Sequence, residues 1–106
     1  MEQSSTCRTI SVADARNRLA SENAVFIDIR DQESYDQGHV PGAVRIDDGS
    51  VGDFITASDR NTTHIVYCYH GITSRAGAVY FEQNGFADVF SMDGGFCAWD
   101  GPGSGR

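Results

Sequence analysis

Apolar residues along the chain fall into short runs that alternate with segments of helical spacing. The runs over 25–29, 43–46 and 65–69 are rich in Val, Ile and aromatic side chains, which is typical of buried β-strands. A shorter run over 88–90 has the same character, and a first strand is expected near Cys7. This alternation predicts a doubly wound α/β fold, in which a mostly parallel five-stranded sheet carries helices on both faces.

Three segments between these runs have the apolar spacing of amphipathic helices. Ser11 can cap the first helix, and Asp14, three residues later, is favourable near the positive end of the helix dipole. The second helix is expected over 49–57. The third begins near Ser74 and ends where Gly85 supplies a stop. The chain is therefore expected to consist of repeated strand, loop and helix units.

The length of 106 residues fits one domain, which we place at residues 1–100, followed by a glycine-rich tail over 101–106 that we expect to be flexible. Fifteen acidic residues against eight basic ones give a net charge of −7, which argues against binding to nucleic acid. No apolar run approaches the roughly 20 residues of a membrane span, and no signal peptide is visible. We expect a cytoplasmic protein, a monomer or weak dimer, without membrane contact.

Cys68 has the most informative position of the three cysteines, because it ends a buried strand and precedes a loop that enters a helix. Such loops point backbone N–H groups and a helix N-terminus at a bound anion, and the same groups stabilise a thiolate. The pattern predicts an activated sulfur nucleophile, against the alternative of a small, inert core residue. The residues expected around the bound anion are Tyr69, His70, Gly71, Ile72, Thr73, Ser74 and Arg75.

Three motifs in this sequence resemble the rhodaneses, which are thiosulfate sulfurtransferases. The string 68–74 is similar to the active loop of rhodaneses of the single-domain GlpE type. Upstream, Tyr35 and the string 39–43 fit the rhodanese signature of an aromatic residue followed by His, an aliphatic residue, Pro, Gly and Ala. Downstream, 93–96 followed by Trp99 resembles the aspartate, glycine, glycine, aromatic motif of the family. Together the three matches span most of the chain.

The resemblance implies a sulfurtransferase that works through a persulfide on Cys68. The thiolate would attack the sulfane sulfur of thiosulfate, sulfite would leave, and the sulfur would pass to an acceptor such as cyanide, a small dithiol or thioredoxin. This chemistry needs no organic cofactor and no metal. The histidines and cysteines also lack the paired spacing of a zinc site.

Two other functions remain open from the sequence. A persulfide on Cys68 could serve a protein partner in a relay or binding module, with free thiosulfate incidental. A phosphatase or arsenate reductase is the other alternative. Cysteine phosphatases have an arginine after five intervening residues, however, whereas position 74 here is a serine. The family comparison implies that the loop after Cys68, which is one residue shorter than the loop of such phosphatases, suits a sulfur atom better than a phosphoryl group.

Charged residues near the loop have two interpretations each. Asp28 and Arg30, at the end of the second strand, are expected to brace the neighbouring loop by hydrogen bonds, and Arg30 could also shape the field of the site. Arg75 could bind the anionic substrate or only favour helix solubility. His39 is expected to fix the turn at Pro41 and Gly42.

Residues in and after the loop receive individual expectations. The side chain of His70 should point outward because the loop N–H groups point inward. Thr73 is expected to place a hydroxyl near the sulfur, and Ser74 to cap the following helix. Cys97 departs from the family pattern and could resolve the persulfide, but we expect a small apolar filler beside Trp99.

Overall fold

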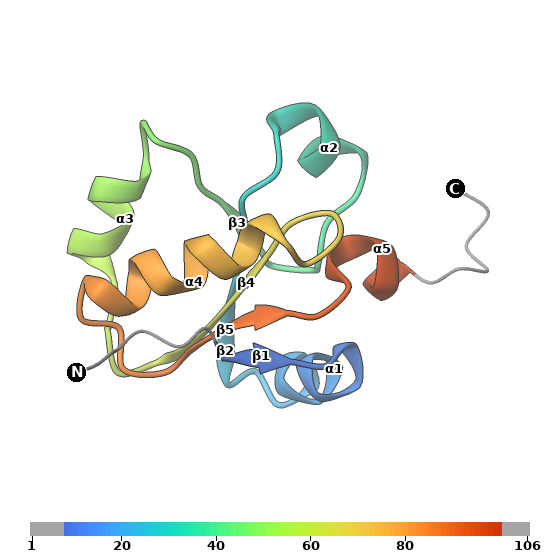
Figure 1. Ribbon diagram of the computed structural model, residues 1–106, viewed down its shortest axis with the longest axis horizontal. Coiled ribbons are helices and arrows are strands. Elements are labelled where there is room, and N and C mark those ends of the chain that lie inside the picture. Colours follow the sequence, from blue (N-terminus) through green and yellow to red (C-terminus); the bar gives the residue numbers. More distant parts are fainter. Residues whose placement is uncertain (1–7, 101–106) are drawn as a thin grey trace.

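The structure is a computed structural model that describes residues 8–100, and these residues form a parallel sheet with helices packed on it (Figure 1). In chain order the elements are β1 (Thr9–Ile10), α1 (Val12–Ala20), β2 (Ala24–Asp28), α2 (Gln32–Gln37), β3 (Val44–Arg45), α3 (Val51–Ala57), β4 (Thr63–Tyr67), α4 (Thr73–Gln83), β5 (Val89–Met92) and α5 (Gly95–Asp100). None of these helices is long and apolar enough to cross a membrane.

The sheet has the strand order β1-β5-β4-β2-β3, and every neighbouring pair is parallel. The prediction of a mostly parallel, five-stranded sheet is confirmed. β4 lies in the middle and is buried along its whole length. The carboxyl ends of the strands therefore meet at one edge, where open α/β sheets bind ligands.

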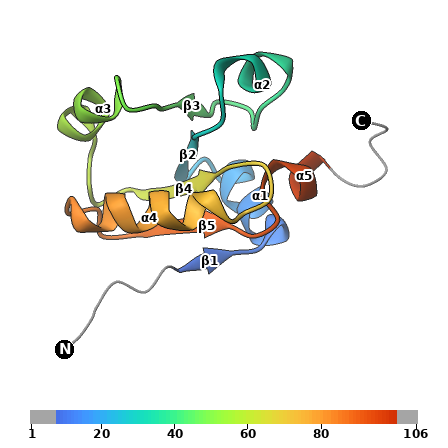
Figure 2. The same ribbon diagram turned by 45° about the horizontal axis from the view of Figure 1, so that its top comes forward.

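Two hydrophobic clusters occupy the two faces of the sheet. One joins Phe26, Ile65 and Met92 to α1 through Ala15 and to α5 through Trp99. The other cluster packs the opposite side of the same strands against α3 and α4, with Phe81 and Phe86 among its largest side chains. Figures 1 and 2 show these helices around the sheet. Helices on both faces are therefore confirmed, and the fold is doubly wound.

Two helix starts show how the local sequence sets the elements. Ser11 caps α1 as predicted, since its hydroxyl accepts a hydrogen bond from the N–H of Asp14 at 3.0 Å. The prediction of Ser74 as the cap of α4 is wrong. The cap position is Ile72, whose side chain makes no capping hydrogen bond, and Ser74 lies inside the first turn with no exposed surface. This shift frees the Ser74 hydroxyl for another role.

Two short helices were not expected from the sequence, because six residues are too few to show a helical period. α2 follows β2 and contributes Tyr35 to the core. α5 begins at Gly95, the second glycine of the pair 94–95, which the sequence indicates only as a turn. Strand β5 also extends to Met92, beyond the expected run. The strand expected at Cys7 and the flexible tail over 101–106 lie outside the described residues.

Candidate active site

Cys68 is the first residue after the central strand β4, and α4 begins five residues later at Thr73. The intervening loop therefore lies at the carboxyl edge of the sheet and leads directly into a helix N-terminus, as the sequence predicts. The Cys68 side chain is largely buried, with 7% of its surface exposed. The thiol is therefore surrounded mainly by protein atoms rather than by water.

Hydrogen bonds to the sulfur favour its ionised form. The backbone N–H of Ser74 donates to Cys68 Sγ at 3.3 Å. Burial raises the pKa of the thiol, but hydrogen bonds from the Ser74 hydroxyl and from the N–H groups of Ser74, Gly71 and His70 outweigh burial. The pKa of Cys68 consequently lies below the ordinary value of a cysteine thiol, which is the condition for an activated nucleophile.

The hydroxyl that contacts the sulfur comes from Ser74, and the Thr73 side chain, which we expected there, is exposed. Ser74 Oγ also lies 2.7 Å from Ser91 Oγ, on the neighbouring strand β5, and both serines are fully buried. Ser91 was not identified from the sequence. The available signal was a small polar residue inside an otherwise apolar strand.

Glycines let the loop approach the turn between β5 and α5 closely. Gly71 has φ +85°, and a Cβ at this position would lie 2.7 Å from the backbone N of Gly94 and 3.0 Å from Met92 O. A Cβ on Gly95 would lie 2.6 Å from Cys68 O. The glycine motif around residues 94–95 therefore packs its backbone directly against the cysteine loop.

Backbone hydrogen bonds join the cysteine loop to the first turn of α5. The N–H of Phe96 donates to Cys68 O at 2.8 Å, and the N–H of Cys97 donates to Tyr69 O at 3.0 Å. These bonds leave the loop N–H groups on the other side of the chain free to face the sulfur. The first turn of α5 is thus part of the site although it does not touch Sγ.

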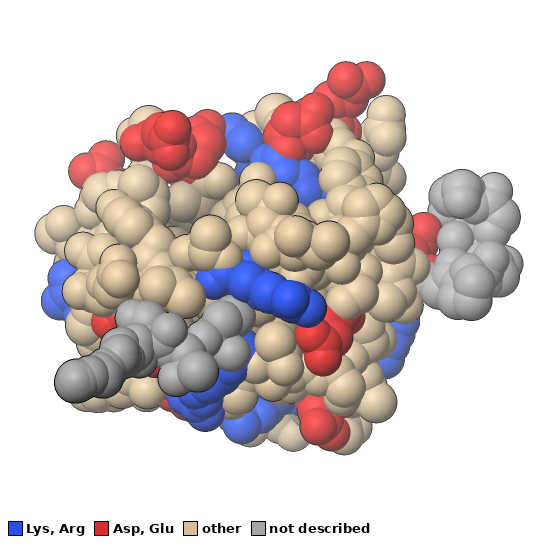
Figure 3. All heavy atoms as spheres, viewed as in Figure 1, with Lys and Arg blue, Asp and Glu red and all other residues tan. Residues whose placement is uncertain are grey.

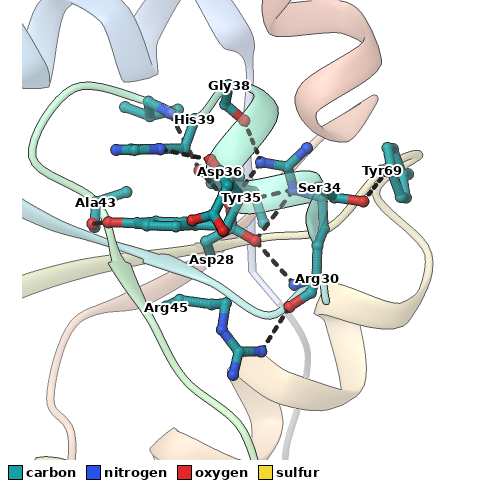
Figure 4. Close-up of polar contacts among 12 residues, drawn as sticks. Asp28, Arg30, Ser34, Tyr35, Asp36, Gly38, His39, Ala43, Arg45 and Tyr69 are labelled. Carbon is teal, nitrogen blue, oxygen red and sulfur yellow. Dashed lines mark hydrogen bonds and ion pairs between the residues drawn. The ribbon is translucent and has the colours of Figure 1, made fainter. Parts of the chain in front are cut away.

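Asp28, the last residue of β2, and Arg30 form a buried ion pair (Figure 4). Arg30 Nη2 lies 2.6 Å from Asp28 Oδ2, and both side chains are almost completely buried. Arg30 Nη2 also donates to Gly38 O at 2.7 Å, and Tyr67 donates its hydroxyl to Asp28 at 2.7 Å. Burial and the bond to Asp28 raise the pKa of the Tyr67 hydroxyl, which stays protonated as a donor.

The guanidinium of Arg30 sits among aromatic rings from both sides of the loop. Its central carbon lies 4.3 Å from the ring centroid of Phe96, 5.2 Å from that of Tyr69 and 5.5 Å from that of Tyr67. Tyr67 and Tyr69 flank Cys68 in the chain, and Phe96 is hydrogen-bonded to it. Arg30 therefore fixes the backbone around the nucleophile through three cation–π contacts.

Helix α2 adds two further anchors to the loop region (Figure 4). The hydroxyl groups of Ser34 and Tyr69 are hydrogen-bonded to each other. Tyr35 donates to Ala43 O at 2.6 Å, and His39 stacks on the Tyr35 ring at a centroid distance of 3.8 Å. His39 thus supports the segment around the predicted turn through Tyr35.

Several residues expected at the site are exposed to solvent. His70 and Arg75 are exposed, and 71% of the surface of Ile72 is exposed. Within residues 8–100 the Arg75 guanidinium makes no hydrogen bond or ion pair. Cys97 is also exposed, so its expected role as a buried filler is wrong. The groups that hydrogen-bond to the Cys68 thiol are backbone N–H groups and the Ser74 hydroxyl.

Charge on the surface is uneven despite the net excess of acid. Figure 3 shows the most prominent groups of acidic side chains along the upper edge of one face, with further acidic side chains in its lower right part, and arginine side chains at its centre and near its upper and lower edges.

Known proteins are similar to this chain in sequence and in fold. Residues 11–101 match the rhodanese-like domain. The chain is 47% identical to the thiosulfate sulfurtransferase GlpE of Pseudomonas paraeruginosa over 91% of its own length and 86% of that protein. It is 41% identical to the GlpE protein of Pseudoalteromonas translucida, with 86% of this chain and 87% of that protein covered.

Solved structures agree with this match. A rhodanese-like domain protein from Staphylococcus aureus superposes with a TM-score of 0.77 at 27% identity, covering 91% of this chain and 94% of that one. A human single-domain sulfurtransferase shares the fold with a TM-score of 0.77 at 19% identity, covering 89% of this chain and 96% of that one. By fold, by motifs and by identity to its relatives, the chain belongs to the rhodanese-like domain family.

Proposed function

We propose that the protein is a thiosulfate sulfurtransferase whose nucleophile is Cys68. The observation that carries the proposal is the position of Cys68 Sγ at the N-terminus of α4, where it accepts hydrogen bonds from Ser74. The names of the GlpE relatives support thiosulfate as the donor. The lowered thiol pKa favours the thiolate, which is the reactive form, and a stabilised thiolate is also a good leaving group.

The proposed reaction is a double displacement. In the first half, the Cys68 thiolate attacks the outer sulfur of thiosulfate, a new S–S bond forms, and sulfite leaves with the electron pair of the broken bond. In the second half, cyanide or the thiolate of an acceptor attacks the outer persulfide sulfur. Thiocyanate or an acceptor persulfide forms, and the Cys68 thiolate is released. The backbone N–H groups hold negative charge on sulfur in both halves.

Asp28 and Arg30 help to hold the Cys68 sulfur in place relative to its hydrogen-bond donors. The Asp28–Arg30 pair holds Tyr67, Tyr69 and Phe96 around the loop. Arg75 is exposed without an internal partner in the described part of the chain, so its charge is available to attract the dianionic donor. No step of this scheme needs a metal or an organic cofactor. The need for a free thiolate fits a reducing, cytoplasmic location.

The acceptor decides between this reaction and the relay alternative. A relay module would turn over thiosulfate and cyanide slowly but would exchange sulfur rapidly with a protein thiol such as that of thioredoxin. Hydrolysis of an aryl phosphate or reduction of arsenate would support the third possibility. The backbone cradle at Cys68 has a serine at position 74 where such a phosphatase needs an arginine.

Steady-state production of thiocyanate from thiosulfate and cyanide tests the proposal. Double displacement predicts parallel lines in double-reciprocal plots when both substrates are varied. Cys68→Ser should abolish turnover and keep the fold, whereas Cys97→Ser serves as the matched control and should keep turnover. Loss of activity in Cys97→Ser, or retained activity in Cys68→Ser, would assign the chemistry to another thiol.

A further inference from the structure

Two buried hydroxyl groups lie behind the nucleophile, and only one of them touches it. Ser74 is in the first turn of α4, and Ser91 is in β5, where it is paired with Val66 of the central strand. Neither side chain has exposed surface, and their Oγ atoms are 2.7 Å apart. The N–H of Ser74 donates to Cys68 Sγ at 3.3 Å, and a hydrogen bond from the Ser74 hydroxyl is among the causes of the lowered pKa of that thiol.

The direction of these hydrogen bonds follows from the number of protons. Each hydroxyl has one proton to donate. Within residues 8–100, the Ser91 hydroxyl has Ser74 Oγ as its only hydrogen-bond partner, whereas the Ser74 hydroxyl has Ser91 Oγ at 2.7 Å and also acts on the Cys68 thiol, whose pKa it lowers. If Ser74 donated to Ser91, the Ser91 proton would be buried without an acceptor and the sulfur would lose a donor.

The opposite direction satisfies every group. When Ser91 donates to Ser74 Oγ, the Ser74 proton points to the sulfur, and both buried protons are hydrogen-bonded. A buried donor without a partner is strongly unfavourable, so this direction is preferred. It also polarises the Ser74 hydroxyl, because a hydroxyl that accepts a hydrogen bond becomes a better donor.

We propose that Ser91 is a positioning residue that directs the Ser74 hydroxyl proton onto the sulfur of Cys68. Ser91 acts on the nucleophile only through Ser74. The inference rests on the proposed function in taking Cys68 as the reacting sulfur, but it concerns the ionisation of that thiol and can be measured without thiosulfate.

The experiment is alkylation of the folded protein by iodoacetamide across a range of pH, with each cysteine followed separately by mass spectrometry. The chain has no lysine, and trypsin cleaves after Arg60 and Arg75, so the peptide 61–75 contains Cys68 as its only cysteine. Its alkylation rate against pH gives the apparent pKa of Cys68. Near-ultraviolet circular dichroism checks that each variant is folded.

Ser91→Ala should raise the apparent pKa of Cys68 by about half a unit to one unit, because the Ser74 proton is no longer held on the sulfur. Ser91→Thr keeps a hydroxyl and should stay close to the wild type. Ser74→Ala should raise the pKa at least as much as Ser91→Ala. Adding Ser91→Ala to Ser74→Ala should then change little, because Ser91 acts through Ser74.

Thr63→Val is the matched control. It also removes a buried hydroxyl, which donates to Asp88 at the opposite end of β4, and it should leave the Cys68 pKa unchanged. An unchanged pKa in Ser91→Ala, or additive effects of Ser91→Ala and Ser74→Ala, would overturn the proposal. Failure of thiocyanate production with a Cys68 pKa that still responds to Ser91 would reject the proposed function alone.

Discussion

Replacement of Gly71 by alanine is the sharpest test of how the loop is seated. The alanine Cβ would lie 2.7 Å from the backbone N of Gly94 and 3.0 Å from Met92 O, at a residue whose φ is +85°. Neither neighbour is the end of a flexible side chain, so the loop itself must move. The N–H of residue 71 is among the hydrogen-bond donors that lower the pKa of Cys68, so movement of this residue should raise that pKa.

The loss of unfolding free energy in Gly71→Ala has two components, backbone strain and overpacking, which alanine substitutions at other glycines of this chain can separate. Gly42 has φ +79° but open space where a Cβ would stand, and Gly52 lies in α3 with open space and no positive φ. Gly42→Ala should cost about 1–2 kcal/mol of unfolding free energy, from backbone strain alone. Gly52→Ala should stabilise the protein by about 0.5–1 kcal/mol. Gly71→Ala adds about 1–3 kcal/mol of overpacking to the strain, for a loss of about 2–5 kcal/mol.

Urea denaturation of the three variants measures these free energies, and the alkylation profile of Cys68 measures the cradle. We expect the free energy of unfolding to decrease in the order Gly52→Ala, wild type, Gly42→Ala, Gly71→Ala. The pKa of Cys68 should be raised in Gly71→Ala alone. A Gly71→Ala protein as stable as Gly42→Ala, with an unchanged Cys68 pKa, would refute the close seating of the loop.

Three further predictions concern charge and pH. Arg75→Ala should raise KM for thiosulfate more than it lowers kcat, because an exposed charge attracts substrate and transition state alike; unchanged kinetics would make Arg75 only a helix residue. Arg30→Met should lower the free energy of unfolding, measured by urea denaturation, by about 3–5 kcal/mol, because Asp28 is left buried without its partner. Adding Asp28→Asn should restore part of this loss. If Arg30→Met is as stable as the wild type, the ion pair does not stabilise the fold. Because the pKa of Cys68 is lowered, the alkylation rate should fall as pH falls through a midpoint below about 8.5, the value of a free cysteine, and a midpoint at or above that value would mean that the cradle is absent.

The sequence predicts the elements whose signal is local. The apolar run of β4 and the helical spacing of α4 are long enough to identify, and their junction places Cys68 at the carboxyl edge of the sheet. The helices α2 and α5 have six residues each, and a period of 3.6 residues is not visible over that length. The glycine pair 94–95 indicates a turn but not the helix that begins at Gly95.

The missed parts of the site depend on contacts between distant segments. Ser91 meets Ser74 only because β5 is the neighbour of β4, and strand order is a property of the whole fold. The three rings around Arg30 come from β4, the cysteine loop and α5. Ser74 was expected to cap α4 because serine favours caps, but its burial under the loop makes its hydroxyl a partner of the sulfur.

The central claim is that Cys68 carries the transferred sulfur. Mass spectrometry of the protein after incubation with thiosulfate, without an acceptor, tests it most directly. The account predicts one added sulfur atom, located in the tryptic peptide 61–75 and removed by cyanide with formation of thiocyanate. No added sulfur, or an added sulfur that persists in Cys68→Ser, would contradict it.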